Sequence, residues 1–422
     1  MSVDRRRIAV IGAGISGLAA AYYLSRKHDV WVFERDTRLG GHTHTVIVNS
    51  SRGPIPVDTG FIVHNEKTYP HFCSLMRELG VATQPSDMSF AVTSLVDDFE
   101  YSSHGLSGFF AQRSNLLRPA HYTLLTEILR FNREALKMLH QPSESLPESL
   151  SIAGFLSQGR YNPVFRDRYL YPMASAVWSM APADMDDFPA LALLRFFENH
   201  GMLGINTHPQ WKTIRGGSHS YLPPLTAPFR EQIRMGVEIR TIHRGLDFVR
   251  LEFANAASEQ FDDVVFACHG DQVLPMLGDP SPAERQILSQ FRFTSNHAVL
   301  HTDDRLLPRR PAARASWNYL LQGPGKVSLT YDMNRLQSLA VPENYCVTLN
   351  AASIIRSDRV LKQITYHHPL MNAASMGAQR RWAEISGLHR THYCGAYWFY
   401  GFHEDGVRSA LRVASALGAA AV

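Results

Sequence analysis

Apolar residues at the start of the chain follow the pattern of a βαβ unit. The run Arg7–Ile11 is typical of a buried parallel strand, and the alanine- and leucine-rich run Ile15–Lys27 is typical of a helix. The next apolar run, Val30–Phe33, has the aromatic and β-branched content of a second strand. Because parallel strands joined by a helix build α/β sheets, this pattern predicts an α/β fold that begins at the first residues.

The pattern of apolar positions then changes twice along the chain. Residues 85–209 contain helical stretches such as Tyr122–Leu139, and strand-like alternation returns after residue 215. A second change covers residues 280–387, before a last strand, His392–Gly395, and a last helix, Gly406–Leu417. We therefore predict a discontinuous Rossmann-like domain, interrupted twice by an α+β substrate domain whose first part is mostly helical. The predicted Rossmann-like segments are residues 1–80, 210–285 and 385–422, and the predicted substrate-domain segments are residues 81–209 and 286–384.

A glycine motif, GAGISG at residues 12–17, lies between the first strand and the first helix. Gly12 permits the tight turn, Gly14 lets the backbone approach a pyrophosphate, and Gly17 lets the helix pack closely on the sheet. The helix N-terminus offers free N–H groups to the phosphates. Glu34, at the end of the second strand, has the spacing of a carboxylate that binds an unphosphorylated ribose. The motif therefore predicts a site for FAD or NAD rather than NADP.

A double glycine, Gly40-Gly41, follows shortly after this carboxylate and precedes His42. Two adjacent glycines let the backbone run close beneath a flavin and its ribityl chain, which the plain nicotinamide motif does not require. The backbone around Val237 has the place of an adenine contact, and Gly395 and Gly406 flank the last strand and helix. We predict FAD as the cofactor. Its predicted binding residues are Gly12, Gly14, Ile15, Ser16, Gly17, Glu34, Arg35, Gly40, Gly41, His42, Val237, Gly395, Gly406 and Val407.

Composition and charge exclude several other classes of protein. The chain has 422 residues, 45% of them hydrophobic, and a net charge of +4, without the basic runs that nucleic-acid binding requires. Its four cysteines form no CxxC pair, and the pair His42 and His44 lies on the loop assigned to flavin, so we expect no metal. No run reaches the roughly 18 apolar residues of a membrane span. We expect a cytoplasmic protein that can also make peripheral contact with the inner face of the membrane, and leave its oligomeric state open.

These motifs occur in the same order in the flavin-containing amine oxidase and phytoene desaturase superfamily, which the chain resembles. The stretches Phe293–Thr302, Ser316–Tyr319 and Thr330–Gln337 resemble a bacterial branch of predicted NAD/FAD-binding proteins associated with cyclopropane and furan fatty-acid synthesis. The resemblance implies an amine-oxidase-like fold and FAD contacts from Gly12, Gly14, Gly17, Glu34, Gly40, Gly41, Val237 and Gly406.

The chain departs from the amine-oxidising members of that superfamily at two places. Gly395-Ala396 stands where the family usually has glycine followed by an acid. On the strand where amine oxidases often carry a lysine beside the flavin, this chain has Asn296-His297. We therefore expect an FAD-dependent oxidoreductase that oxidises or desaturates a lipid acyl chain, unsaturated or methylated, by hydride transfer to flavin N5. The alternatives are an amine or amino-acid oxidase, and a redox-silent FAD-binding partner of a lipid-modifying enzyme.

Three residues are candidates for catalysis. His297 is a histidine, a residue type that can act as an acid or base near neutral pH, although any one of the 20 histidines can equally be structural. Tyr397 and Trp398 belong to an aromatic cluster that either forms a wall over the flavin or packs in the core.

A further segment, Gly105–Arg118, pairs apolar residues with two arginines. This composition suits docking on an anionic membrane, although a buried helix of the substrate domain has the same pattern.

Overall fold

The computed structural model describes residues 5–141, 150–178, 182–204, 209–323 and 326–419. A five-stranded parallel sheet contains the first two strands of the chain and the last one. Its order is β10 (Ile233–Met235), β2 (Asp29–Glu34), β1 (Arg7–Ile11), β14 (Asp263–Phe266) and β20 (Thr391–Tyr393). All five strands fall within the segments predicted as Rossmann-like, and the predicted α/β fold class with a discontinuous sheet is confirmed.

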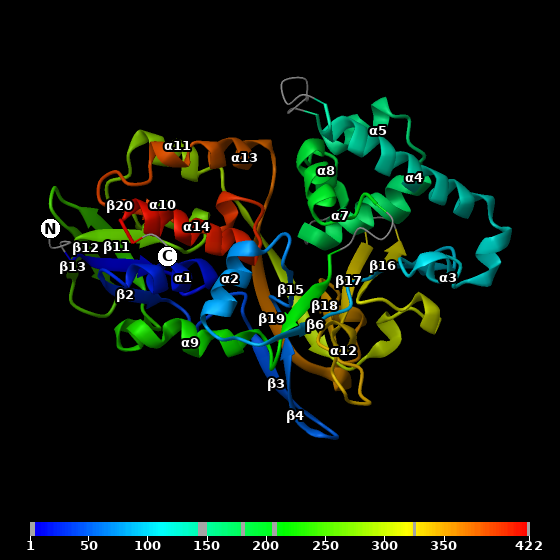
Figure 1. The fold of residues 1–422 in the computed structure, drawn as a ribbon, viewed down its shortest axis with the longest axis horizontal. Helices are drawn as coiled ribbons and strands as arrows, with labels where there is room; N and C mark the ends of the chain where they lie inside the picture. The colour runs from blue at the N-terminus through cyan, green and yellow to red at the C-terminus, as the bar shows by residue number, and fades with distance from the viewer. Residues whose placement is uncertain (1–4, 142–149, 179–181, 205–208, 324–325, 420–422) are drawn as a thin grey trace.

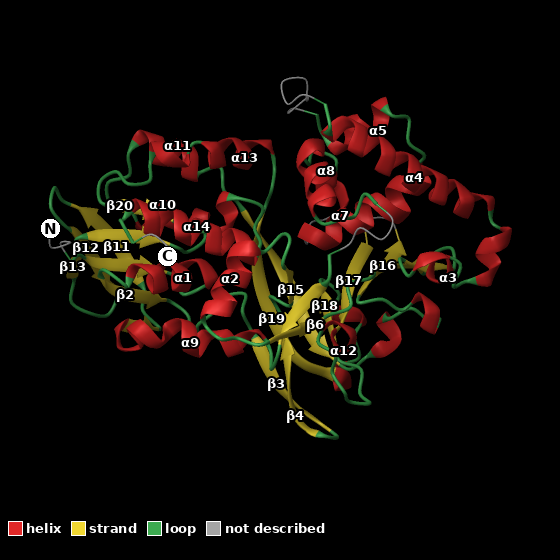
Figure 2. Ribbon diagram, in the orientation of Figure 1, coloured by secondary structure: helices red, strands yellow, loops and turns green. Residues whose placement is uncertain are grey.

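A seven-stranded mixed sheet forms the centre of the rest of the molecule (Figure 2). Its order is β19 (Val360–Pro369), β15 (Phe293–His301), β18 (Cys346–Leu349), β17 (Lys326–Asp332), β16 (Trp317–Gly323), β7 (Phe90–Ser94) and β8 (Phe99–Ser102). The small sheets comprise β3 (Thr45–Ser50) and β4 (Gly53–Asp58); β5 (Val63–Asn65), β9 (Trp211–Ile214) and β6 (Thr83–Pro85); and β11 (Ile239–Arg244), β12 (Val249–Phe253) and β13 (Glu259–Phe261).

Helices cover both parts of the molecule. Around the parallel sheet are α1 (Ile15–Leu24), α2 (Pro70–Glu78), α9 (Leu222–Thr226), α10 (Gly270–Met276), α11 (Pro282–Leu288), α13 (Ala373–Arg380) and α14 (His403–Ala416). On the opposite side of the molecule lie α3 (Gly105–Phe109), α4 (Pro119–Leu139), α5 (Ile152–Gln158), α6 (Pro163–Phe165), α7 (Tyr171–Trp178) and α8 (Ala190–Asn199), while α12 (Met333–Leu336) follows β17 (Figure 1). No helix among the described residues is both long enough and apolar enough to cross a membrane.

The segment predicted to be mostly helical also supplies three strands. β6, β7 and β8 lie within residues 81–209, and β7 pairs in parallel with β16, more than 200 residues later in the chain. Local periodicity could not show this pairing, because the hydrogen-bonding partner is remote in sequence.

Two large apolar cores meet at one boundary. One core lies around the parallel sheet and the other lies under the seven-stranded sheet and the helices α4, α7 and α8. Val63, Met88 and Phe402 pack against both cores. A large cavity lies at the boundary between the two cores.

Candidate active site

A cavity of about 1560 Å³ runs from the parallel sheet to the helices on the opposite side of the molecule. At one end it is lined by residues at the carboxyl ends of the parallel strands, among them Ile11, Glu34 and Ala267. At the other end its lining comes from β7, α3, α4, α7 and α8. Ligands of open α/β sheets bind outside the carboxyl ends of the strands, so the first end has the position of a nucleotide site.

The glycine motif has the geometry that a dinucleotide requires. Gly12 has a φ of +104°, and its N–H donates to the carbonyl of Phe33 at 2.8 Å. A Cβ atom on Gly17 would lie 1.9 Å from the Gly12 carbonyl oxygen, whereas one on Gly14 would meet no atom within 4 Å. Gly14 therefore faces open space in the cavity, as a residue that lies against a pyrophosphate must.

The double glycine is hydrogen-bonded directly to this motif. The N–H of Gly40 donates to the carbonyl of Ala13 at 2.8 Å, and a Cβ atom on Gly41 would lie 3.2 Å from the Cα of Gly14. Glu34 Oε2 accepts a hydrogen bond from Ala13 N–H at 2.7 Å. Val237 N–H donates to the carbonyl of Glu34 at 2.9 Å, which brings the predicted adenine contact beside the predicted ribose carboxylate. The residues present thus fit an extended dinucleotide such as FAD.

Most of the predicted cofactor-binding residues line the cavity, and three do not. The lining includes Gly12, Gly14, Ile15, Ser16, Glu34, Arg35, Gly40, Gly41, His42, Val237 and Gly395. Gly17, Gly406 and Val407 lie behind this surface. A Cβ atom on Gly406 would lie 2.8 Å from Ile15 Cγ2 and from Ser16 Oγ, so this glycine lets α14 pack against α1. The consequence of that packing is that the N-termini of both helices lie at the cavity, where their free N–H groups favour negative charge.

Four histidines line the cavity beside the glycine motifs: His403, which is buried, and His42, His269 and His368, which are partly buried. Burial lowers the pKa of His269 and His368 to about 4 and that of His403 to about 3, and holds the pKa of His42 well below its usual value. All four imidazoles are therefore neutral at pH 7. His42 Nε2 has no hydrogen-bond partner among the described residues and is available to a bound group.

The sequence motifs pointed to His42 alone among these four as a cofactor contact. His403 stacks on Phe61 with ring centroids 3.6 Å apart, and its Nε2 lies 3.0 Å from Thr43 Oγ1. His269 stands just after β14, at a carboxyl strand end, and this position was a usable signal. His368 lies on β19, whose neighbourhood depends on tertiary pairing with β15.

The three candidate catalytic residues lie in different places. Tyr397 lines the cavity, and its hydroxyl has no hydrogen-bond partner among the described residues. Trp398 is buried behind the cavity surface, 4.7 Å from the ring of Phe291. His297 is exposed on the outer face of β15, with Nδ1 3.2 Å from Thr365 Oγ1, and does not line the cavity. Side chains alternate across a strand, so the buried neighbour Asn296 takes the inward position instead.

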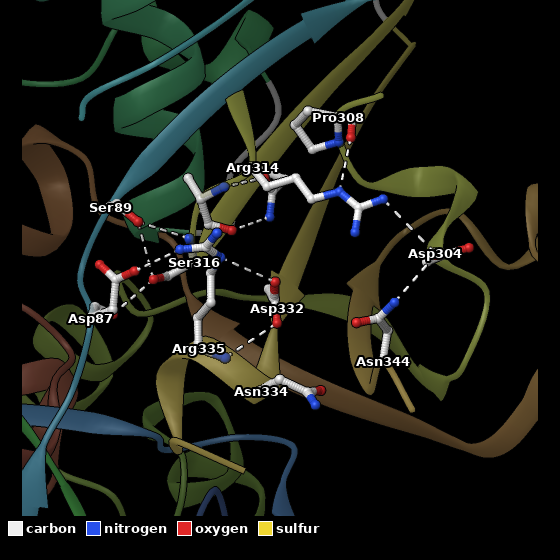
Figure 3. A network of polar contacts seen from close by, with 12 residues as sticks. Asp87, Ser89, Asp304, Pro308, Arg314, Ser316, Asp332, Asn334, Arg335 and Asn344 are labelled. Atoms are coloured by element: carbon white, nitrogen blue, oxygen red, sulfur yellow. Dashed lines mark hydrogen bonds and ion pairs between the residues drawn. The ribbon is translucent and has the colours of Figure 1, made fainter. Parts of the chain in front are cut away.

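The far half of the cavity has an apolar wall. Its lining includes Phe90, Tyr101, Phe109, Leu125, Ile128, Leu129, Tyr169, Met173, Val177, Trp178, Phe196, Met202, Trp317 and Tyr331. Asp87 is the one acidic side chain of the described lining away from the nucleotide motifs, and no lysine lines the cavity there. Arg335 Nη1 lies 3.2 Å from Asp87 Oδ2, and Ser316 Oγ donates to the Asp87 carbonyl (Figure 3). The Asp87 carboxylate is therefore already neutralised by an arginine.

Asp58 connects the β3–β4 hairpin to the RGGS motif at residues 215–218. Its carboxylate is fully buried and accepts hydrogen bonds from the Ser218 N–H at 2.9 Å, from the hydroxyls of Ser218 and Thr45, and from Gln337 Nε2 at 3.1 Å. A Cβ atom on Gly217 would lie 2.6 Å from Thr45 Cγ2, so a glycine is needed for this approach. The RGGS motif, which does not line the cavity, thus acts through Asp58 to hold the hairpin in place.

Replacing Asp58 by asparagine is expected to change how stability depends on pH. Burial raises the pKa of Asp58 from 3.8 to about 6, so the folded protein binds this proton more tightly than the unfolded chain. The stabilisation from Asp58 is then greatest below pH 4 and is lost as pH rises towards 6. Asparagine does not titrate, so the stability lost by Asp58→Asn should be smaller at pH 7 than at pH 4, by about 2.4 kcal/mol. Urea unfolding of both proteins between pH 4 and 7 measures this difference.

A matched control uses Asp247, whose side chain is 93% exposed. Asp247→Asn should cost little stability anywhere in this range, because the side chain lies almost wholly in solvent. A constant difference between wild type and Asp58→Asn over the whole range would contradict the buried, titrating carboxylate.

Comparison with known proteins agrees with this geometry. A family model described as "Flavin containing amine oxidoreductase" matches residues 15–352. Protoporphyrinogen oxidase 2, chloroplastic/mitochondrial, of Arabidopsis thaliana is 55% identical over 49 residues, which are 11% of this chain and 10% of that protein. The chain therefore aligns with only a small part of this relative's length.

Two solved structures match over nearly their whole length. A CLA-producing fatty acid isomerase from P. acnes superposes with a TM-score of 0.71 and 16% identity, covering 98% of this chain and 99% of the other. A variant of a putrescine oxidase superposes with a TM-score of 0.72 and 15% identity, with the same coverage. At these identities the likeness shows the fold alone, because one fold hosts many chemistries.

Proposed function

The chain belongs to the flavin containing amine oxidoreductase family and is an FAD-dependent oxidoreductase, and we propose that it oxidises or desaturates a lipid acyl chain. The observation that carries the proposal is the apolar wall of the far half of the cavity. Such a wall binds apolar substrate through burial of its surface, and none of its residues carries a negative charge that would pair with an ammonium group. An unsaturated or methylated acyl chain fits this chemistry.

The size of the cavity supports a substrate that is bound together with the cofactor. Pockets for a single small molecule usually measure about 300–1,000 Å³, and this cavity of about 1560 Å³ exceeds that range. The glycine motifs and Glu34 account for one end. The remaining space, from Phe402 to α4, has room for an extended chain.

Some lining residues of the cavity would bind the cofactor, and others exclude water. Glu34, Gly14 and Gly41 line the cavity and would hold the ribose, the pyrophosphate and the flavin side of FAD, respectively. Bound FAD supplies the hydride-accepting chemistry. The aromatic rings of Trp178, Phe196 and Phe402, which lie within 6.5 Å of one another, exclude water from the space where a C–H bond would be placed.

An amine substrate finds poor support in this cavity. A cationic amine binds best beside a free carboxylate, which the aromatic rings of the wall only partly replace, and Asp87 is the only acid of the described far lining. Arg335 already neutralises that carboxylate. The fold likeness to a fatty acid isomerase, a protein whose name refers to acyl substrates, is compatible with the lipid proposal.

Anaerobic flavin reduction tests the proposal. The holoenzyme is mixed with detergent-solubilised phospholipids that carry methylated or unsaturated acyl chains, and separately with putrescine and simple primary amines. We expect the flavin absorbance to bleach with at least one of the lipids and with none of the amines. Bleaching by amines but not by lipids, or by neither class, would overturn the lipid proposal.

A further inference from the structure

We propose that the outer surface of α3, the 3-10 turn η1 (Arg113–Leu117) and the start of α4 docks on a bilayer of anionic lipid, and that this bilayer feeds the cavity. The inference rests on the proposed lipid substrate and adds where that substrate comes from. The docking face consists of Leu106, Leu116, Leu117, Tyr122 and Leu129.

The apolar side chains of the docking face are exposed together on one part of the surface, which is unusual for a protein that is covered only by water. Leu117 is 87% exposed, Leu106 68% and Leu116 51%. The face is continuous, because Tyr122 Oη donates to the Leu116 carbonyl at 3.0 Å and the Tyr122 ring lies 5.8 Å from that of Phe110, one turn after Leu106. Exposed leucines of this kind contribute favourable free energy only when another apolar phase covers them and removes them from water.

The docking face borders the outer end of the cavity. Leu106 and Leu129 are exposed and also belong to the cavity lining, together with His104 and Leu125. In Figure 1, α3 and α4 lie at the opposite side of the molecule from the parallel sheet. An acyl chain that left a bilayer here would therefore enter the apolar half of the cavity first, without passing through water.

The charges around the docking face favour anionic lipid over a second copy of the chain. Residues 103–137 contain five basic and two acidic side chains. Both acids, Glu127 and Glu134, lie within ion-pair distance of Arg130. Arg113, Arg133 and Lys137 are exposed and form no ion pair among the described residues. Two such faces would repel each other, whereas lipid phosphates would neutralise them.

Flotation with vesicles tests the docking face directly. The holoenzyme is mixed with vesicles of phosphatidylcholine alone, or of phosphatidylcholine with phosphatidylglycerol, both with saturated, unbranched chains. We expect binding to the phosphatidylglycerol vesicles, weakened about tenfold in Leu117→Asp and about fivefold in Arg113→Glu. The matched control is Leu246→Asp, because Leu246 is 95% exposed on the turn between β11 and β12, away from the docking face. This variant should bind like the wild type.

Three results would overturn the docking proposal. They are absence of vesicle binding by the wild type, an equal loss in Leu246→Asp, and a vesicle-free dimer that Leu117→Asp dissociates while vesicles bind neither protein. Flavin absorbance confirms that each variant is folded and loaded. Flotation measures docking without turnover, and solubilised lipids measure oxidation without a bilayer, so failure of the docking face and failure of the lipid substrate are distinguishable.

Discussion

Replacing Gly14 by valine is expected to weaken FAD binding by about 100-fold, or ~2.8 kcal/mol, while the protein still folds. Gly14 has a φ of −76°, which any residue adopts, and a Cβ atom there would meet no protein atom within 4 Å. The added Cβ atom therefore meets only what occupies the cavity. Titration of the deflavinated protein with FAD measures the affinity, and circular dichroism with thermal unfolding of the apoprotein measures the fold.

Variants of two other glycines serve as comparisons for Gly14→Val. Gly17→Val should destabilise the apoprotein itself, because its Cβ would lie 1.9 Å from the Gly12 carbonyl oxygen. Gly377→Ala, within α13 and also facing open space, should change neither the affinity nor the fold, apart from a small gain in helix stability. Unchanged FAD affinity in Gly14→Val would show that the pyrophosphate does not lie against the first helix.

The end of the cavity at the parallel sheet could be predicted from the sequence because its determinants are local. The turn at Gly12, the open position at Gly14 and the carboxylate of Glu34 all lie within one βαβ unit, whose spacing is fixed by strand and helix geometry. Eleven of the predicted cofactor residues accordingly line the cavity. We assigned Gly406 to the cofactor site because of the resemblance. In the structure this glycine lets α14 pack against α1, and the motif alone does not distinguish such helix packing from cofactor binding.

The far half of the cavity could not be predicted in the same way. Tyr101 and Phe109 lie more than 200 residues before Trp317 in the chain, and tertiary contacts such as the parallel pairing of β7 with β16 bring their segments together. An apolar stripe on a helix such as α4 looks the same in sequence whether it faces a packed core or a cavity. The exposed leucines of η1 show the same ambiguity, since the pattern of a buried helix and that of a docking surface coincide until burial is known.

A shift of one residue along the strand decides whether a side chain at this position faces the interior or the solvent, and His297 faces the solvent. The strand itself was expected, and β15 forms there, but neighbouring side chains of a strand point to opposite faces. Asn296 points inward and is hydrogen-bonded to Asn350, whereas His297 faces solvent. The sequence shows no lysine on β15, and no lysine lines the cavity among the described residues, so that part of the prediction agrees with the structure.

Replacing Ile128 by tryptophan is expected to shorten the substrate that the enzyme accepts. Ile128 lies on α4 and lines the far half of the cavity, between the apolar wall and the docking face. A larger ring there fills space that only a long acyl chain reaches. For long-chain substrates kcat/KM should fall by about 100-fold, or ~2.7 kcal/mol, and for short acyl chains it should stay within about threefold of wild type. Anaerobic rates of flavin reduction over a series of chain lengths measure both.

The conservative variant Ile128→Leu shows whether Ile128→Trp acts by blocking space in the cavity or by disturbing the packing of α4. Leucine has the same volume as isoleucine, so its rates should match those of the wild type at every chain length. Thermal unfolding of Ile128→Trp shows whether the ring is accommodated in the cavity or strains α4. A loss that is equal for short and long chains would mean that the acyl chain does not extend towards α4. The docking face would then lie beside the cavity without supplying it, because Leu129, Ile128 and Leu125 line the cavity from the same helix.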